Sequence, residues 1–536
     1  MHNGFTTPWR LLAAGAILLT AAAGGITAAA AEKETLVIGM DISDTRTFDP
    51  GRQAEYSPPL PLRAAYDMLV TMDAGDYVTI RPALAERWER TADGMAWVFH
   101  LRNGVRFASG NPFTAADVKF SMDRLLNLKD QPAEYAENLG STEIIDDFKV
   151  KLNLVDKNQP LLSLLVAVPF AIYDSKLVQE HGGIAGPNAE KEDMATEWLN
   201  QNSAGAGAYT LVSWTRNSEI VLERNSHYWR GMPAFERVII KHIGDSAAQL
   251  LTLRRGDIDV AMNLTPDQIE SIKNEPDVNI HEATSLDYMY MTLTSNPEFN
   301  VAVANKACRL AIAHAIDYDG IIQGLLGGYA TRPAGFIPVG LACSTEEIAE
   351  KYRYKTDPKK AKQLLAECGE PNGFSFELNY AKAEIAGTSY DIVAQKVASD
   401  LGKLGIKADL TPLSQVTLIE RYRGGAKNTT SVLTFWNPDA PEAYLWSQAS
   451  VYRVADRVHW TVPQELRDIV FQAAGELDPI KQEALYSKYT EALVDQANYL
   501  VLFQPVYRVA TRKEITGYKP TAAGWHVDLF DVKAVD

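Results

Sequence analysis

The residues best suited to chemistry in this 536-residue chain do not form a recognisable catalytic motif. The nine histidines are scattered singly, and the sequence contains no G-x-S-x-G, H-E-x-x-H or C-x-x-C pattern. Catalytic triads can be assembled from residues that are distant in sequence, so a secreted hydrolase remains an alternative. The sequence itself offers little support for an enzyme.

One glycine-rich stretch, Gly205 to Ala208, has a composition that can bind phosphate groups. A dinucleotide-binding loop, however, needs a third glycine and lies between a strand and a helix. Here the third glycine is missing, and Tyr209 to Trp214 follows with the pattern of a strand. The stretch is therefore interpreted as a turn.

The three cysteines, Cys308, Cys343 and Cys368, allow at most one intramolecular disulfide. Their spacings fit no metal site, and the sequence does not determine which two of them pair. No cofactor and no metal are predicted. A long helical pattern runs from Asn305 to Gly328. His314 lies within its apolar face and is interpreted as a core histidine.

The net charge and the length of the chain indicate which partners are unsuited to it and how many structural units it can form. The net charge of −16 argues against nucleic acid and against an anionic membrane as partners. At about 150 residues per domain, the chain has room for roughly three structural units with cores of their own.

The elements that would position any site are clearest between Pro82 and Leu126. A turn at Asp93-Gly94 leads into an alternating strand around Trp97 to Leu101. A second turn ends at Pro112, and Thr114 to Asp117 then predicts a capping box that opens a helix.

These residues resemble a fingerprint of the family 5 extracellular solute-binding proteins, the peptide, opine and nickel class that serves ABC transporters. The matching pieces are PALAERW, WVFHLRNGVRF and GNPFTAADV, in the family's order. A second fingerprint begins at the glycine turn before Tyr209 and continues through Asn225-x-x-Tyr228-Trp229 to Ile243. In the family, the first stretch is scaffold, so it indicates the class but not the ligand.

The resemblance implies an α/β fold of two lobes, joined by crossing strands and hinged around a ligand cleft, with an extra domain. The predicted domains are a signal peptide at 1–31, a discontinuous lobe I at 32–60, 205–280 and 503–536, an added domain at 61–204, and lobe II at 281–502.

The resemblance also implies a ligand contact at Trp436-Asn437-Pro438-Asp439, which is similar to the family's W-x-x-D after a strand. In peptide-binding members this aspartate pairs with the ligand's α-amino group, which makes Asp439 the candidate amine clamp. The alternative is an aspartate that only caps a turn after Pro438. Where dipeptide-binding relatives carry a Gln-Arg-Pro that holds the ligand's carboxylate, this chain has Ala383-Glu384-Ile385. The positive partner is therefore missing there.

Three tyrosines are further candidates for ligand contact. Tyr56 lies in a loop that often reaches the cleft in this family, and its alternative is a surface loop residue. Tyr288 and Tyr290 lie in a segment that crosses between the lobes in the family, and their alternative is packing in the core or at the rim.

The resemblance implies a monomeric periplasmic receptor that delivers a small peptide, or a peptide-like or opine-like amine, to the permease of an ABC importer. The alternative ligand is a non-peptide solute such as an oligosaccharide, a nickel complex or haem. The expected ligand has a cationic end at Asp439 and is not held by a terminal carboxylate at residues 383–385.

The N-terminal residues predict export and give a first testable prediction. A single charge at Arg10 precedes an apolar run from Leu11 through Ala23 and a small-residue tail that ends at Ala31. The run is shorter than the roughly 20 residues of a membrane-spanning helix. With no cysteine near the cleavage site, no lipid anchor is predicted. N-terminal sequencing of the exported protein is expected to begin at or near Glu32, and a retained Met1 would contradict the export prediction.

Overall fold

The computed structural model describes residues 33–77, 79–341, 343–424, 431–436, 440–476, 478–521 and 527–535. The predicted signal peptide at 1–31 lies outside these residues, and so do Asn437 and Asp439. None of the helices formed by the described residues is long and apolar enough to cross a membrane.

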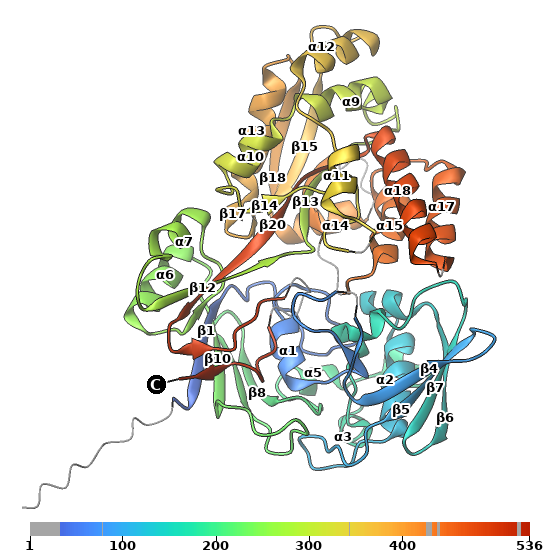
Figure 1. Ribbon diagram of the computed structural model, residues 1–536, viewed down its shortest axis with the longest axis vertical. Coiled ribbons are helices and arrows are strands. Elements are labelled where there is room, and N and C mark those ends of the chain that lie inside the picture. Colours follow the sequence, from blue (N-terminus) through green and yellow to red (C-terminus); the bar gives the residue numbers. More distant parts are fainter. Residues whose placement is uncertain are drawn as a thin grey trace, which may run out of the picture. The chain divides into compact units, whose positions relative to one another are not determined.

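One extended sheet runs through the described part of the chain (Figure 1). Its strands, in spatial order, are β18 (Lys407–Leu413), β15 (Ser375–Ala381), β19 (Val432–Trp436), β13 (Tyr288–Thr292), β20 (Tyr499–Arg512), β11 (Val260–Ala261), β1 (Thr35–Met40), β10 (Arg237–His242), β9 (Glu219–Arg224) and β8 (Tyr209–Thr215). Two further strands, β12 (Val278–Thr284) and β14 (Ala330–Thr331), pair with β20 outside this path. Both parallel and antiparallel pairs occur, so the sheet is mixed.

A smaller antiparallel sheet has the order β4 (Ala85–Arg90), β5 (Ala96–Leu101), β7 (Lys149–Leu154), β6 (Leu139–Asp146). The helix α2 (Ala115–Leu128) follows β5 and begins with the predicted capping box. The backbone N–H of Thr114 donates to the Asp117 carboxylate at 2.8 Å. The prediction for this stretch is confirmed, because turn, strand and cap are all encoded within a few residues of one another.

Hydrophobic side chains separate the described residues into two parts, which we call the first and the second lobe. The core of the second lobe is one cluster drawn from residues between Leu286 and Phe503. The first lobe contains three clusters, centred on β1 and β10, on β5 and α2, and on α6 and α7. The domain boundaries given by the sequence stay a prediction.

The remaining elements are short connectors and helices. In the first lobe these are α1 (Pro59–Ala65), β2 (Val70–Thr71), β3 (Arg81–Pro82), η1 (Gln131–Ala136), η2 (Leu164–Val166), η3 (Val168–Phe170), α3 (Ser175–Glu180), α4 (Ala189–Glu192), α5 (Thr196–Leu199), α6 (Ser246–Arg255), α7 (Pro266–Ile272), β21 (Ile515–Thr516) and β22 (Lys533–Ala534). In the second lobe they are α8 (Val301–Ala304), α9 (Lys306–Ala315), α10 (Tyr318–Gly324), α11 (Glu346–Tyr352), α12 (Pro358–Glu367), β16 (Glu384–Ile385), β17 (Thr388–Ser389), α13 (Tyr390–Gly402), α14 (Gln415–Arg423), α15 (Ala443–Val451), α16 (Arg453–Arg457), α17 (Gln464–Gly475) and α18 (Pro479–Gln496).

The long helical pattern at 305–328 folds as two helices, α9 and α10. Ile316 leaves the helical conformation, and the Asp317 side chain caps α10 by accepting from the backbone N–H of Gly320 at 2.9 Å. An aspartate is a good helix cap, so it starts a new helix here rather than continuing the first. The His314 ring is nearly buried and bonds the Lys355 carbonyl at 2.8 Å through Nδ1, which confirms its interpretation as a core residue.

Cys308 and Cys368 form the disulfide, which links α9 to the end of α12. Cys343 is free and buried, and burial raises the pKa of its thiol to about 12. A thiol held protonated in this way is a poor nucleophile and a poor metal ligand.

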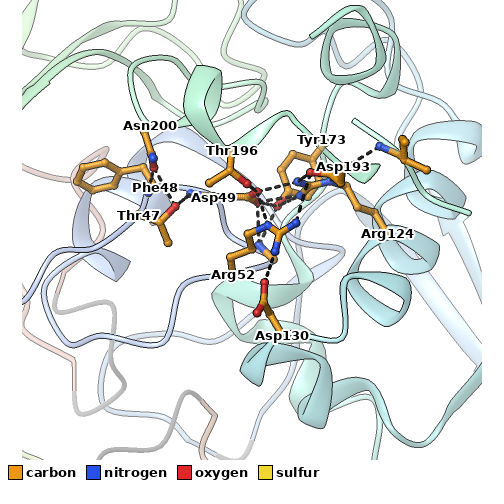
Figure 2. A network of polar contacts seen from close by, with 12 residues as sticks. Thr47, Phe48, Asp49, Arg52, Arg124, Asp130, Tyr173, Asp193, Thr196 and Asn200 are labelled. Carbon is orange, nitrogen blue, oxygen red and sulfur yellow. Dashed lines mark hydrogen bonds and ion pairs between the residues drawn. The ribbon is translucent and has the colours of Figure 1, made fainter. Parts of the chain in front are cut away.

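A buried guanidinium connects α2 to two other segments of the first lobe (Figure 2). Arg124 has no exposed surface, and its nitrogens lie 2.7 and 2.8 Å from oxygens of Asp49 and of Asp193. The Tyr173 hydroxyl also donates to Asp49 at 2.8 Å. Burial alone would raise the pKa of Asp49, but the charge and hydrogen bonds of Arg124 outweigh it and lower this pKa to about 2.

Replacing this buried cation should destabilise the first lobe. Arg124→Met would leave the buried carboxylates of Asp49 and Asp193 with only the more distant Arg52, at 3.8 and 3.7 Å, as a counter-charge. Breaking a buried ion pair in this way costs about 3–5 kcal/mol. Urea unfolding at neutral pH measures the loss. The matched control is Arg237→Met, where side chains 51% and 47% exposed form the pair with Glu223 and a change of at most about 1 kcal/mol is expected. Equal effects in both variants would contradict the structural role of Arg124.

Candidate functional site

Two backbone segments join the lobes, and both belong to the extended sheet. The first half of β20 pairs with β13 in the second lobe, with Met289 opposite Phe503. Its second half pairs with β12 in the first lobe, with Ile280 opposite Ala510. The sequence expectation of crossing strands is thus met by β20 and by the chain from β12 to β13 (Figure 1).

Gln504 lies where β20 stops pairing with β13 and begins to pair with β12. Its side chain has no exposed surface, and its Nε2 donates to the carbonyls of Ser285 and Val339 at 2.6 and 2.7 Å. Its Oε1 accepts from the Val339 N–H at 2.8 Å. Because Ser285 precedes β13 and Val339 belongs to a loop of the second lobe, this one amide holds three segments together.

A buried carboxylate and two tyrosines lie on the first-lobe side of this point. Asp287 is 2% exposed and accepts a hydrogen bond from the Tyr507 hydroxyl. Burial and the Asp287 charge raise the pKa of Tyr507, so its phenol stays protonated and acts as the donor. The ring of Tyr56 is half-buried, with its centroid 6.3 Å from that of Tyr507. The structure therefore brings Tyr56 to the crossing strand, and its contact with a ligand stays a prediction.

Tyr288 and Tyr290 are buried in the core of the second lobe, at 0% and 1% exposed. The Tyr288 hydroxyl donates to the Phe336 carbonyl at 2.6 Å, and the Tyr290 hydroxyl lies 3.3 Å from that of Tyr422. Every residue of β13 is buried, because strands flank it on both edges and helices cover it. Core packing, the alternative considered for both tyrosines, is the arrangement found here, and ligand contact by either ring stays a prediction.

Trp436 is the last residue of β19 and lies opposite Tyr288 in the crossing strand β13. Its half-buried ring packs edge-on against Phe336, with the centroids 5.6 Å apart. The guanidinium of Arg453 lies 5.6 Å from the Trp436 ring centroid. Asn437 and Asp439 follow immediately but lie outside the described residues.

Glu384 belongs to the β16–β17 hairpin, which reaches from the second lobe to the first. Between these strands, Gly387 lies so close to the Leu264 carbonyl that a Cβ would approach its oxygen to 2.4 Å, and the φ of +71° also favours glycine. Partial burial and the charges of Asp41 and Asp245 raise the pKa of the exposed Glu384. Glu384 thus faces carboxylates of the first lobe, where a cation fits better than an anion.

Three further contacts join the lobes, and none of them is predicted from the sequence. The Ser163 hydroxyl donates to Glu442 at 2.6 Å, Arg453 pairs with Glu134, and Arg423 donates to Gln131. Arg453 and Arg457 are four residues apart on α16, a spacing that places two arginines on one helix face. That spacing is the only sequence feature that could have indicated them.

No group of three or more His, Cys, Asp or Glu side chains in the described ranges is arranged to hold a metal ion. The crossing segments carry tyrosines, backbone carbonyls and one buried carboxylate. These groups can orient a ligand.

Comparison with known proteins decides the family. The sequence profile of the bacterial extracellular solute-binding proteins, family 5, matches residues 79–455. The chain belongs to this family. It is 30% identical over 510 residues to the probable D,D-dipeptide-binding periplasmic protein DdpA of Escherichia coli K12, covering 94% of both proteins. The family prediction made from the two fingerprints is confirmed.

Solved structures agree on the fold. A dipeptide-binding protein from Pseudoalteromonas sp. SM9913, in complex with Met-Leu, superposes with a TM-score of 0.80 at 19% identity over 94% of this chain and all of that one. DppA from Helicobacter pylori, in complex with the peptide STSA, gives a TM-score of 0.77 at 23% identity over 94% and 99%. The predicted α/β fold, two lobes of the periplasmic binding protein type, is confirmed.

The role of Gln504 at the junction of the lobes leads to a stability prediction. Gln504→Leu keeps the side-chain size but removes the partner of the buried Ser285 carbonyl and of two part-buried backbone groups of Val339. Each buried group that stays unsatisfied costs about 1–3 kcal/mol. Urea unfolding should show a loss of at least about 2 kcal/mol. Gln395→Leu is the control, since the exposed Gln395 bonds only Asp391 on its own helix. A Gln504→Leu protein as stable as that control would contradict the role assigned to the amide.

Proposed function

We propose that this solute-binding protein is the substrate-binding component of an ABC importer and carries a small peptide, or a peptide-like or opine-like amine, to its permease. The observation that carries the proposal is the 30% identity to DdpA, which extends over 94% of both chains. Among less similar relatives is a haem-binding protein A of Haemophilus influenzae, 26% identical, so the ligand has to be tested directly.

The ligand's amine is proposed to pair with Asp439, with Trp436 and Asn437 beside it. Support comes from the position of the W-x-x-D residues, which begin at the end of β19 next to the crossing strand β13. Glu384 adds negative charge rather than a carboxylate clamp, and its raised pKa reflects its partial burial and the carboxylates that it faces. Tyr56 and the buried pair Tyr288 and Tyr290 support the site from the crossing segments.

The proposed mechanism is a population shift. A ligand that touches both lobes only when they are closed favours the closed form by the difference in its affinity for the two forms. The permease then recognises closure as occupancy. On this proposal the exported protein is a periplasmic monomer without a lipid anchor and without catalytic activity, built from the domains predicted from the sequence.

A panel of compounds tests the ligand class. L-Ala-L-Ala, D-Ala-D-Ala, the peptide Ser-Thr-Ser-Ala, a neutral disaccharide, haem and nickel–histidine are each added in melting scans. A true ligand at a hundred times its dissociation constant should stabilise the protein by about 2.7 kcal/mol and be recovered intact. If only the disaccharide, haem or nickel–histidine shifts the melting temperature, or if a peptide is consumed, the peptide receptor is excluded.

Asp439→Asn should weaken binding of the best peptide by about a hundredfold or more. Leaving one charge of a buried pair without its partner costs about 3–5 kcal/mol, which corresponds to that loss in affinity. Calorimetric titration of both proteins measures the ratio. Asp257→Asn, which removes an exposed carboxylate paired with Arg255 on the first lobe, is the control and should bind as the parent does. Unchanged affinity in Asp439→Asn would remove this residue from the site.

A further inference from the structure

Three arginines of the second lobe lie on α14 and α16, and their positive charge is only partly balanced among the described residues. Arg457, on α16, is half-buried with its guanidinium 5.4 Å from the centroid of the Tyr422 ring. Among the described residues, no carboxylate lies within ion-pair distance of Arg457 or of Arg423. Only Arg453 has such a partner, which is Glu134 of the first lobe.

The guanidiniums of Arg423 and Arg457 lie close enough to affect one another. Burial and the charge of Arg457 lower the pKa of Arg423, while Glu134, Tyr135 and Glu55 act in the opposite direction. Arg423 follows Tyr422 at the end of α14, and the Tyr422 ring lies beside the guanidinium of Arg457. We call Arg423, Arg453 and Arg457 the arginine cluster.

Hydrogen-bond donors at the arginine cluster exceed the acceptors found around it. The Nε of Arg453 and the Nε1 of Trp436 are buried, and neither has a hydrogen-bond partner in the described part of the chain. A buried donor without a partner costs free energy, so such groups usually have one in the working protein. These donors without partners occur in a protein whose net charge is −16, so acidic residues outnumber basic ones in the chain.

We infer that the arginine cluster is a subsite for a carboxylate of the ligand, from either its C-terminus or an acidic side chain. A planar guanidinium donates two parallel hydrogen bonds to a carboxylate, which makes arginine the residue that suits this group best. Among the described residues Arg457 has no ion pair to give up, and Arg453 lies beside Trp436, one of the residues proposed for the amine site. The inference rests on the proposed function and supplies the carboxylate partner that residues 383–385 lack.

The subsite also relates ligand charge to the contact between the lobes. Arg453 pairs with Glu134 and Arg423 bonds Gln131, both on η1 of the first lobe. A carboxylate bound by Arg457 would balance charge beside these contacts and so favour the arrangement in which they form. Ligands with a free carboxylate are therefore preferred over their neutral amides.

Calorimetric titration compares three compounds in each of the L,L and D,D series. They are dialanine as the free acid, dialanine as the C-terminal amide, and alanyl-glutamate as the C-terminal amide, which carries its only carboxylate on the side chain. The parent should bind the free acid about 10- to 100-fold more tightly than the amide. Arg457→Gln should bind both forms with the amide's affinity. A melting scan establishes that each variant is folded, and Arg255→Gln, which changes an exposed arginine, should keep the parent's preference.

The outcomes separate this inference from the proposed function. If the parent binds the alanyl-glutamate amide tightly and Arg457→Gln does not, the subsite holds an acidic side chain. If the parent prefers only the free acid of dialanine, the subsite holds the C-terminus. The subsite is overturned if the parent binds acid and amide with equal affinity. It is also overturned if both Arg457→Gln and Arg453→Gln keep the parent's full preference for the acid. Either result leaves peptide binding intact. Failure of every peptide form to bind the parent contradicts the proposed function itself, and the subsite with it.

Discussion

The structure depends on one continuous strand. The hydrogen bonds of β20 tie it to β13 of the second lobe and to β12 of the first, so both lobes share a single ladder of backbone contacts. A β-ladder resists stretching because every bond would have to break, whereas it twists at modest cost. The lobes can therefore change their mutual orientation only about the few residues where β20 changes its neighbour, and Gln504 lies at that point.

The ion pair of Arg124 within the first lobe is buried, whereas the charged contacts between the lobes are partly exposed. Inside the first lobe, Arg124 is fully buried and satisfied by two carboxylates, an arrangement that fixes segments rigidly (Figure 2). Between the lobes the charged contacts are partly exposed, as for Arg453 and Glu134 with side chains 26% and 38% exposed. Exposed pairs contribute little net stability, so they can form and separate as a ligand enters and leaves. This difference suits a receptor with rigid lobes and a weakly held interface.

How much the sequence could predict follows from the range of each interaction. The capping box of Thr114 and Asp117 and the strands around it depend on neighbours, and they were predicted. The break between α9 and α10 at Asp317 is not predicted, because the apolar residues keep a helical period across it. The single helix-capping side chain of Asp317 outweighs that period. The disulfide partner of Cys308 and the contact between Arg457 and Tyr422 join residues far apart in the chain, and no local pattern reports them. The sequence pattern of Tyr499 to Phe503 predicts a strand that ends at Phe503. In the structure β20 runs on through Pro505, whose missing N–H donor falls where the strand changes partners. Of the candidate site, the sequence predicts Tyr56 and Trp436 as ligand contacts, and the structure places both beside the crossing segments. The arginine cluster is not predicted from the sequence.

The central claim is that ligand binding shifts the lobes toward a closed arrangement about the crossing segments. Small-angle X-ray scattering of the exported protein, with and without saturating peptide, tests it most directly. The account predicts that the radius of gyration falls on binding while the secondary structure measured by circular dichroism stays the same. An unchanged radius of gyration at saturation, with binding verified by calorimetry on the same sample, would contradict it.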